Sequence, residues 1–147
     1  MGATRSYEPE KVMNGTFGYV YFEGDEVIEI ESFKAETSVS YGDIKQPGDL
    51  YIGKKMLELA GTGEFTINVI DHRVLRKVAE RVNQGKTPKF YITAIMDDPD
   101  SDEVPAYGFK NCTIENLPWA DIQPANVTKQ SYTFAFTQAV NINKSEV

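Results

Sequence analysis

Few residues of this 147-residue chain are of the types that perform chemistry. His72 is the only histidine, and Cys112 is the only cysteine. A zinc site needs more ligands of these types, and a catalytic triad needs a nucleophile motif that the sequence lacks. Cys112 falls in a predicted strand in phase with Ile114, which is typical of a small buried side chain. One cysteine excludes an intrachain disulfide and favours an intracellular folding environment.

Two motifs resemble binding loops but are incomplete. Residues 61–63 (GTG) could begin a dinucleotide fingerprint, but Thr66 stands where the third glycine belongs and the predicted helix begins too late to hold a phosphate. Residues 98–102 (DPDSD) could open a calcium loop, but Glu103 and Phe109 occupy the glycine and glutamate positions. We therefore expect no catalytic residue, no cofactor and no metal site.

The composition is that of one soluble globular domain, with 41% hydrophobic and 25% charged residues. The net charge is −7 and the isoelectric point about 4.7. This balance argues against a basic face that binds nucleic acid through its phosphates. No apolar run approaches the roughly 18 residues of a membrane-spanning helix, so we expect no direct membrane anchor.

The elements that would position any site are mostly strands, two of them very long. Residues 26–40 and 55–70 each alternate over about 15 residues, against a usual length of about 5–6. The alternation changes phase near Glu31 and Ser32, which predicts a β-bulge. Residues 55–70 have one apolar face and one acidic, hydroxyl-rich face. Residues 41–54 contain three glycines and a proline and are predicted to form a long loop.

One amphipathic helix is predicted at residues 72–84, with Asp71 as its N-cap and Gly85 as its C-terminal stop. Its basic residues are expected to cover the exposed face: Arg73, Arg76, Lys77 and Arg81. The remaining predicted strands are residues 17–23, 90–96, 107–115 and 131–140, with an acidic turn at 97–105 and a loop at 123–130. The fold class is therefore mainly β, a β-sandwich or small barrel of about six strands, two very long, with one flanking α-helix.

The two long strands exceed what the core of a 147-residue domain requires. Residues 1–16 form a predicted N-terminal arm and residues 141–147 a C-terminal tail, and neither has a core of its own. Strands that join across subunits and arms that pack on neighbours would explain these features, since closing the sheet edges in a ring removes exposed edges.

Several segments together resemble a known family. They are residues 14–24 (NGTFGYVYFEG), 29–36 (EIESFKAE), 53–67 (GKKMLELAGTGEFTI), the helix ending at Gly85, and 90–100 (FYITAIMDDPD). Their order and spacing resemble the PBSX-like tube family, the tail tube proteins of contractile phages and phage-tail-like (R-type) bacteriocins. The resemblance covers roughly residues 14–140, departs at Asn14-Gly15 and is loose after Trp119.

The resemblance implies a single tail tube domain over residues 1–147 that forms hexameric rings stacked into a rigid tube inside a contractile sheath. The loop 41–54 would reach the next ring through Tyr41, Asp43, Lys45, Asp49, Tyr51 and Lys54. The lumen would be lined by Lys34, Glu36, Ser38, Ser40, Glu58, Thr62, Glu64 and Thr66.

The resemblance also implies a structural, non-enzymatic role in a virion or bacteriocin particle. The expected partners are further copies of the chain, the sheath, the baseplate, the tube terminator and a tape measure protein in the lumen. Assembly is expected in the bacterial cytoplasm, without specific nucleic-acid binding and with DNA or ions as cargo. Two alternatives are the tube protein of a type VI secretion system and a monomeric β-barrel binding module with an aromatic cleft near Tyr19, Tyr21 and Tyr107.

Overall fold

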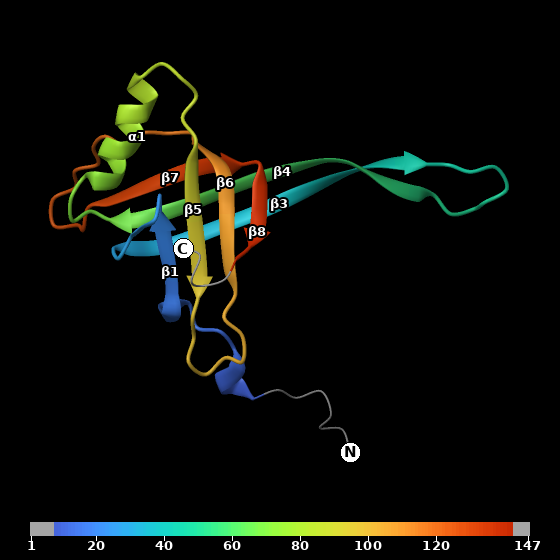
Figure 1. The fold of residues 1–147 in the computed structure, drawn as a ribbon, viewed down its shortest axis with the longest axis horizontal. Coiled ribbons are helices and arrows are strands. Elements are labelled where there is room, and N and C mark those ends of the chain that lie inside the picture. The colour runs from blue at the N-terminus through green and yellow to red at the C-terminus, as the bar shows by residue number, and fades with distance from the viewer. Residues whose placement is uncertain (1–7, 143–147) are drawn as a thin grey trace.

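The computed structural model describes residues 8–142 as a mainly β protein with one α-helix (Figure 1). The fold class predicted from the sequence is confirmed, with eight strands in place of about six. Two short 3-10 turns, Pro9–Lys11 and Gly15–Phe17, precede the first strand. The elements are β1 Gly18–Phe22, β2 Asp25–Glu26, β3 Ile30–Ile44, β4 Gly53–Asn68, α1 Arg73–Asn83, β5 Phe90–Met96, β6 Ala106–Ile114, β7 Lys129–Phe136 and β8 Gln138–Asn141.

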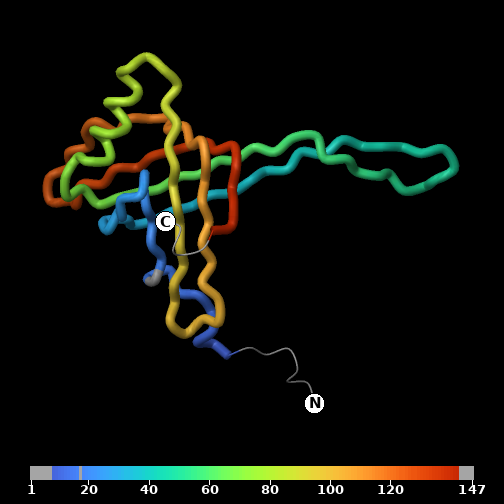
Figure 2. The backbone as a smooth tube through the Cα atoms, viewed as in Figure 1, coloured from blue at the N-terminus to red at the C-terminus, as the bar shows by residue number. Residues whose placement is uncertain are grey.

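The strands pair antiparallel in the order β2-β1-β5-β6-β7-β4-β3, and β8 pairs with β6. Strand β6 connects the two halves, because residues 107–110 pair with β8 and Thr113 and Ile114 pair with β7. In Figure 1, β3, β4 and β7 run across the direction of β1, β5 and β6, so the sheet folds into two layers. The chain traced in Figure 2 shows the β3–β4 hairpin leaving this body as a long arm.

Aromatic rings fill the space between the layers. Phe65 stacks on Tyr132 with ring centroids 4.9 Å apart, and Phe109 and Phe136 lie 5.0 Å apart. The core also contains Val20, Phe22, Val27, Ile67, Val74, Val78, Phe90, Ile92, Cys112, Ile114 and Phe134. The packing depends on close approach of these rings to β4, where glycines leave room for them.

The predicted bulge in the first long strand is confirmed. Strand β3 pairs with β4 from Ile30 to Ile44, and the register shifts between Ile30 and Ser32. The predicted loop 41–54 is too long, because residues 41–44 pair with residues 53–56 and only 45–52 connect the strands. A second register shift at Ser40 and Tyr41 interrupts the alternation there, which hides this pairing from a pattern search.

The predicted last strand, 131–140, is two strands. Strand β7 ends at Phe136, and after Thr137 the chain continues as β8 on a different part of β6. The Thr137 N–H donates to the Lys110 carbonyl at 3.3 Å at this corner. In the sequence, the polar residue Gln138 interrupts the apolar phase of Tyr132, Phe134 and Phe136 at this corner, so the prediction of one continuous strand is wrong there.

Helix α1 agrees with the prediction to within a residue, but its basic face is not free. Arg73, Lys77 and Arg81, four residues apart, form ion pairs with Glu29, Asp25 and Glu23. Of the four basic residues expected to cover an exposed face, Arg76 alone is exposed.

The ends of α1 differ slightly from the prediction. The N-cap is His72, and Asp71, the predicted N-cap, instead accepts a hydrogen bond from the Arg73 N–H at 3.1 Å. Gly85 follows the helix with φ +76°, as expected for a stop.

The pair between Arg73 and Glu29 is asymmetric in burial. Its N–O distance is 2.7 Å, and the side chains are 41% and 2% exposed. Arg73→Met leaves a buried carboxylate unpaired, so it is expected to lower the free energy of unfolding by about 3 kcal/mol. Glu29→Gln leaves the Arg73 guanidinium, which can reach water. This variant is therefore expected to lower the free energy of unfolding by only about 1 kcal/mol. Urea unfolding of the two variants measures both effects.

The control for this pair is Lys77→Met, since Asp25 is open to water and its hydrogen bond from Lys77 merely lowers the pKa of Asp25. Its effect is expected to be much the smallest of the three. An Arg73→Met protein as stable as Lys77→Met would contradict a role for the buried carboxylate.

The N-terminal arm is tied to the body where the structure describes it. The Asn14 N–H donates to the Asp98 carboxylate at 2.9 Å, and Lys11 pairs with Asp102 at 3.0 Å. The arm therefore lies against the acidic turn 97–105, in which Asp98 is buried. The rest of the predicted arm and all but two residues of the predicted tail, 1–7 and 143–147, lie outside the described residues. In the described part of the chain, no helix is long and apolar enough to cross a membrane.

Candidate assembly surfaces

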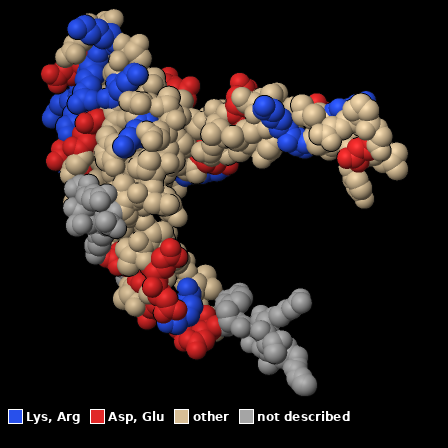
Figure 3. All heavy atoms as spheres, turned by 45° about the vertical axis from the view of Figure 1, so that its right-hand side comes forward, with Lys and Arg blue, Asp and Glu red and all other residues tan. Residues whose placement is uncertain are grey.

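The β3–β4 hairpin projects from the body with very little of its own length buried. From Glu36 to Ala60 every residue except Gly42 is exposed. Figure 3 shows this segment standing clear of the body as a separate arm. A two-stranded ribbon without a covering layer is marginally stable in water. The arm therefore has the form of a surface built to be covered by something else.

All eight residues predicted to line a lumen lie on one face of this hairpin. In the register, Lys34 is opposite Glu64, Glu36 opposite Thr62, and Ser40 opposite Glu58. Ser38 and Thr66 occupy the same face, opposite Ala60 and Ser32. The other face carries the Phe33–Phe65 pair, which joins the core, so these eight residues point away from the core. We call this surface the polar face.

The polar face continues onto β7 and onto Glu115, the residue after β6, which were not among the predicted lumen residues. Glu64 is opposite Thr133, and Thr66 is opposite Ser131. The hydroxyl oxygens of Thr66 and Ser131 lie 3.0 Å apart. A shallow hollow of about 290 Å³ lies on this face. Its lining includes Lys34, Glu36, Thr62, Glu64, Glu115 and Thr133. Carboxylates thus outnumber the single lysine, and the face is electronegative.

The opposite face of the arm is apolar and uncovered. Val39 is opposite Leu59, and Tyr41 is opposite Met56 at the next pair. All four side chains are exposed, as is Leu57 at the register shift. Exposed apolar groups in a contiguous strip mark an interaction site. We call this strip the apolar face of the arm.

A turn closes the arm and presents three more apolar side chains. The Asp49 N–H donates to the Gln46 carbonyl, and Gly48 between them has φ +82°. Proline followed by glycine at these positions is typical of a type II turn. The turn is followed by Leu50, Tyr51 and Ile52, of which the first two are 99% and 87% exposed. These three residues are called the tip.

The six residues predicted to contact a next ring are spread over the end of the arm. Tyr41 and Asp43 belong to β3, Lys54 belongs to β4, and Lys45, Asp49 and Tyr51 belong to the connection. Lys54 forms an ion pair with Asp43 across the strands. The Asp49 carboxylate accepts from the Tyr51 N–H at 3.0 Å, which holds the tip in place.

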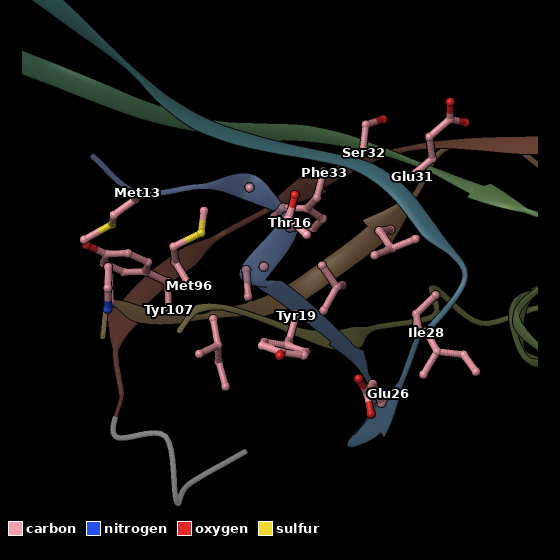
Figure 4. Close-up of a pocket in the computed structure, with 18 residues that line it drawn as sticks. Met13, Thr16, Tyr19, Glu26, Ile28, Glu31, Ser32, Phe33, Met96 and Tyr107 are labelled. Carbon is pink, nitrogen blue, oxygen red and sulfur yellow. The ribbon is translucent and has the colours of Figure 1, made fainter. Parts of the chain in front are cut away.

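A groove with a volume of about 870 Å³ opens on the body between the β1–β3 connection and the ends of β5 and β6 (Figure 4). The alternative of a binding module predicted an aromatic cleft near Tyr19, Tyr21 and Tyr107. Tyr19 and Tyr107 line this groove, and Tyr21 does not. Met13 and Met96 lie near Tyr107, and Ile28 and Glu26 lie at the other end (Figure 4). The described residues of its lining include no histidine, lysine or arginine.

The residues first considered for chemistry are not gathered into a site. His72 is the N-cap of α1, and its ring Nδ1 lies 3.3 Å from the Gln130 side-chain amide nitrogen. The rings of Phe136 and Phe134 occupy the space over Gly61 and Gly63, where a dinucleotide would need to bind. Among the residues that the structure describes, no group of three or more His, Cys, Asp or Glu side chains could hold a metal ion.

Cys112 is buried in the core, where its thiol donates to the Phe109 carbonyl at 3.3 Å. Burial raises the pKa of this thiol to about 12. At pH 8 the thiolate is then roughly one part in ten thousand. The folded protein is expected to leave a chromogenic disulfide reagent unreacted for hours, and the urea-unfolded protein is expected to react within minutes. A fast reaction of one thiol per folded chain would contradict the burial.

The fold matches solved structures over nearly the whole chain. The fold matches the tube-terminating cap of the anti-feeding prophage with a TM-score of 0.72 and 11% identity, over 97% of this chain and 99% of the other. It matches a chain of the PVC sheath–tube complex, an extracellular contractile injection system, with a TM-score of 0.68 and 12% identity, over 93% and 99%. The fold is therefore that of tube proteins of contractile injection systems.

The chain belongs to the phage tail tube protein family, whose match covers residues 5–140. It is also similar to the phage-like element PBSX protein XkdM and to the uncharacterized protein YqbM, both from Bacillus subtilis (strain 168). Each is 24% identical over 92 residues, and the chain spans 63% of the length of each. The resemblance expected from the sequence is confirmed.

Proposed function

We propose that this protein is the structural subunit of the inner tube of a contractile injection system, in which hexameric rings stack into a rigid hollow tube. The observation that carries the proposal is the arm at residues 36–60, exposed on both sides, with one polar and one apolar face. A monomer gains nothing from such an arm. In a ring, each arm is covered by its neighbour.

The two faces define how the ring is built. The apolar face of the arm, with Val39, Tyr41, Met56 and Leu59, packs on the body of the adjacent subunit and is removed from water. Within residues 8–142, β3 pairs with β4 alone, and its other edge is the one that a neighbour's sheet extends. The polar face then lines the lumen, with the residues Lys34, Glu36, Ser38, Ser40, Glu58, Thr62, Glu64 and Thr66.

The charge of this lumen suits passage rather than binding. Each chain carries a net charge of −7, so six copies carry −42. Glutamates on the wall repel phosphates, and the polar face offers one lysine among them. DNA or another polyanion would therefore move through without being held. The role is mechanical and needs no catalytic residue.

The partners follow from the place of such a tube. The solved structures of similar fold come from a PVC sheath–tube complex, a PVC sheath/tube terminator and the baseplate of the anti-feeding prophage, and we extend these partners to this chain. A tape measure protein in the lumen during assembly, assembly in the bacterial cytoplasm, and final location in a virion or bacteriocin tail belong to the same proposal.

Negative-stain electron microscopy of the purified, concentrated chain tests the proposal. Hollow tubes or six-fold rings are expected. A chain that stays monomeric at all concentrations, and that is absent from particles released by its producing cells, would overturn it. Saturable binding of a small ligand by that monomer would instead support a binding module, for which the groove beside Tyr19 and Tyr107 is the available site.

A further inference from the structure

Three methionines lie in the part of the chain that the structure describes, and they differ in exposure. Met13 and Met96 line the groove of Figure 4, where Met13 is 37% exposed and Met96 is half-buried. Met56 lies on β4 in the arm and is 56% exposed. A methionine sulfur reacts with peroxides without an activating group, so its access to solvent decides how fast it is oxidised. Met56 is therefore expected to react first of the three.

A register shift places Met56 on the apolar face of the arm. Residues two apart on a strand point to the same side, so regular alternation would put Met56 beside Glu58 on the polar face. The shift between Ser40 and Tyr41 prevents this, because Ser40 is opposite Glu58 and the next residue, Tyr41, is already opposite Met56. Met56 thus shares the side of Val39, two residues before Tyr41 on β3. A methionine suits a surface that is covered later, because its unbranched thioether adapts to a partner.

Oxidation converts Met56 from an apolar to a polar side chain. The sulfur lone pair attacks one oxygen of hydrogen peroxide, the O–O bond breaks, and after proton transfer the products are the sulfoxide and water. The sulfur is oxidised by two electrons and the peroxide is reduced. The sulfoxide oxygen accepts hydrogen bonds from water in the free chain. It loses them when an apolar surface covers it, and a buried polar group without partners is unfavourable.

From this placement we infer that Met56 is an oxidation site that controls whether a subunit can join a tube. In the free chain its sulfur is open to peroxides, and in a ring the adjacent subunit covers the apolar face that carries it. Oxidation before assembly then blocks the contact, and assembly before oxidation protects the sulfur. A six-fold ring repeats the same contact, so one sulfoxide per chain weakens all six. The inference rests on the proposed function and adds redox regulation to it.

The other oxidisable side chains are separated from Met56 in reactivity or in place. Burial raises the pKa of the Cys112 thiol to about 12, so little thiolate, the form that peroxides attack, is present. Met13 and Met96 lie in the groove on the body, away from the arm. An effect that depends on Met56 can therefore be distinguished from general oxidation by single substitutions.

The test begins with the purified chain in millimolar hydrogen peroxide, which is then removed with catalase. Peptide mapping by mass spectrometry is expected to show the sulfoxide at Met56 before that at Met13 or Met96. The yield of tubes, measured by sedimentation and negative-stain electron microscopy, is expected to fall about tenfold or more. Reductases for both sulfoxide epimers are expected to restore it. In tubes assembled before treatment, Met56 is expected to react about tenfold more slowly than in the free chain.

Two leucine variants separate Met56 from the other methionines. Met56→Leu keeps the volume and the apolar character and cannot form a sulfoxide. This variant is expected to assemble equally well with and without peroxide treatment. The matched control, Met13→Leu, is expected to lose assembly on oxidation as the parent does.

The outcomes distinguish the inference from the proposed function. Normal assembly of a parent chain in which Met56 is fully converted to the sulfoxide would overturn the inference and leave the tube function standing. So would an equal loss of assembly in oxidised Met56→Leu and oxidised parent, because the loss would then belong to another residue. A parent that forms no rings or tubes before oxidation, and that is absent from particles released by its producing cells, overturns the proposed function and the inference with it.

Discussion

Gly63→Ala is expected to lower the free energy of unfolding by about 3 kcal/mol, in the upper part of the range for overpacked cores. A Cβ at this position would lie 2.4 Å from the Phe134 ring and 2.6 Å from the Lys34 carbonyl oxygen. The ring is fully buried and the carbonyl belongs to the β3–β4 ladder, so neither can move without loss of packing or of strand pairing. A loss of this size is a large share of the about 5–15 kcal/mol that holds a domain folded.

Gly53→Ala is the matched control on the same strand. A Cβ there would meet the Ile44 carbonyl at 3.5 Å, an ordinary contact, and the backbone is not left-handed. This variant is expected to be as stable as the parent or slightly more so, because alanine reduces the entropy of the unfolded chain. Urea midpoints measured by circular dichroism compare the two. Equal midpoints for Gly53→Ala and Gly63→Ala would contradict the role of Gly63 as the space for Phe134.

Local patterns in the sequence predict the elements that depend on local physics. The phase change at Glu31 and Ser32 predicts the bulge because a period of two cannot otherwise reverse its faces. Gly85 predicts the helix end because an unstrained left-handed residue is needed there. Alternation likewise predicts both faces of the long strands.

Features that depend on distant partners are not predictable in the same way. Residues 41–44 have no regular alternation, and they become strand because residues 53–56 pair with them. Arg73, Lys77 and Arg81 have the spacing of a solvent-exposed helix face. They are neutralised by acidic residues of the β1–β3 connection, about 50 positions earlier in the chain, and only the fold brings the two together.

The polar face likewise contains residues that local alternation predicts and residues that only strand pairing brings to it. Eight polar-face residues follow from alternation within two strands, but Ser131, Thr133 and Glu115 join them only through the pairing of β7 with β4 and β6. The sequence does separate Thr133 from Tyr132 and Phe134 by alternation. It does not say which neighbouring strand continues that polar side.

Reversing charge on the polar face is expected to leave assembly intact and to impair transport. Glu58→Lys with Glu64→Lys replaces two negative charges by two positive ones, so the net charge per subunit changes from −7 to −3. Both glutamates are exposed and neither forms an ion pair in the described part of the chain, so the fold does not depend on them. Lysines on a lumen wall bind phosphates, so DNA passage or killing by assembled particles is expected to fall about tenfold or more.

The matched control changes the charge equally but away from the polar face. Glu80→Lys with Glu103→Lys also changes the net charge from −7 to −3, at exposed positions on α1 and on the acidic turn. Particles carrying either pair are first compared by electron microscopy, and activity is then measured per assembled particle. If the lumen lies along the polar face, the pair at 58 and 64 impairs transport and the control pair does not. Equal activity of the two pairs in intact particles would place the glutamates of the polar face outside the channel, because a charge on an outer wall cannot hold a polyanion that travels within.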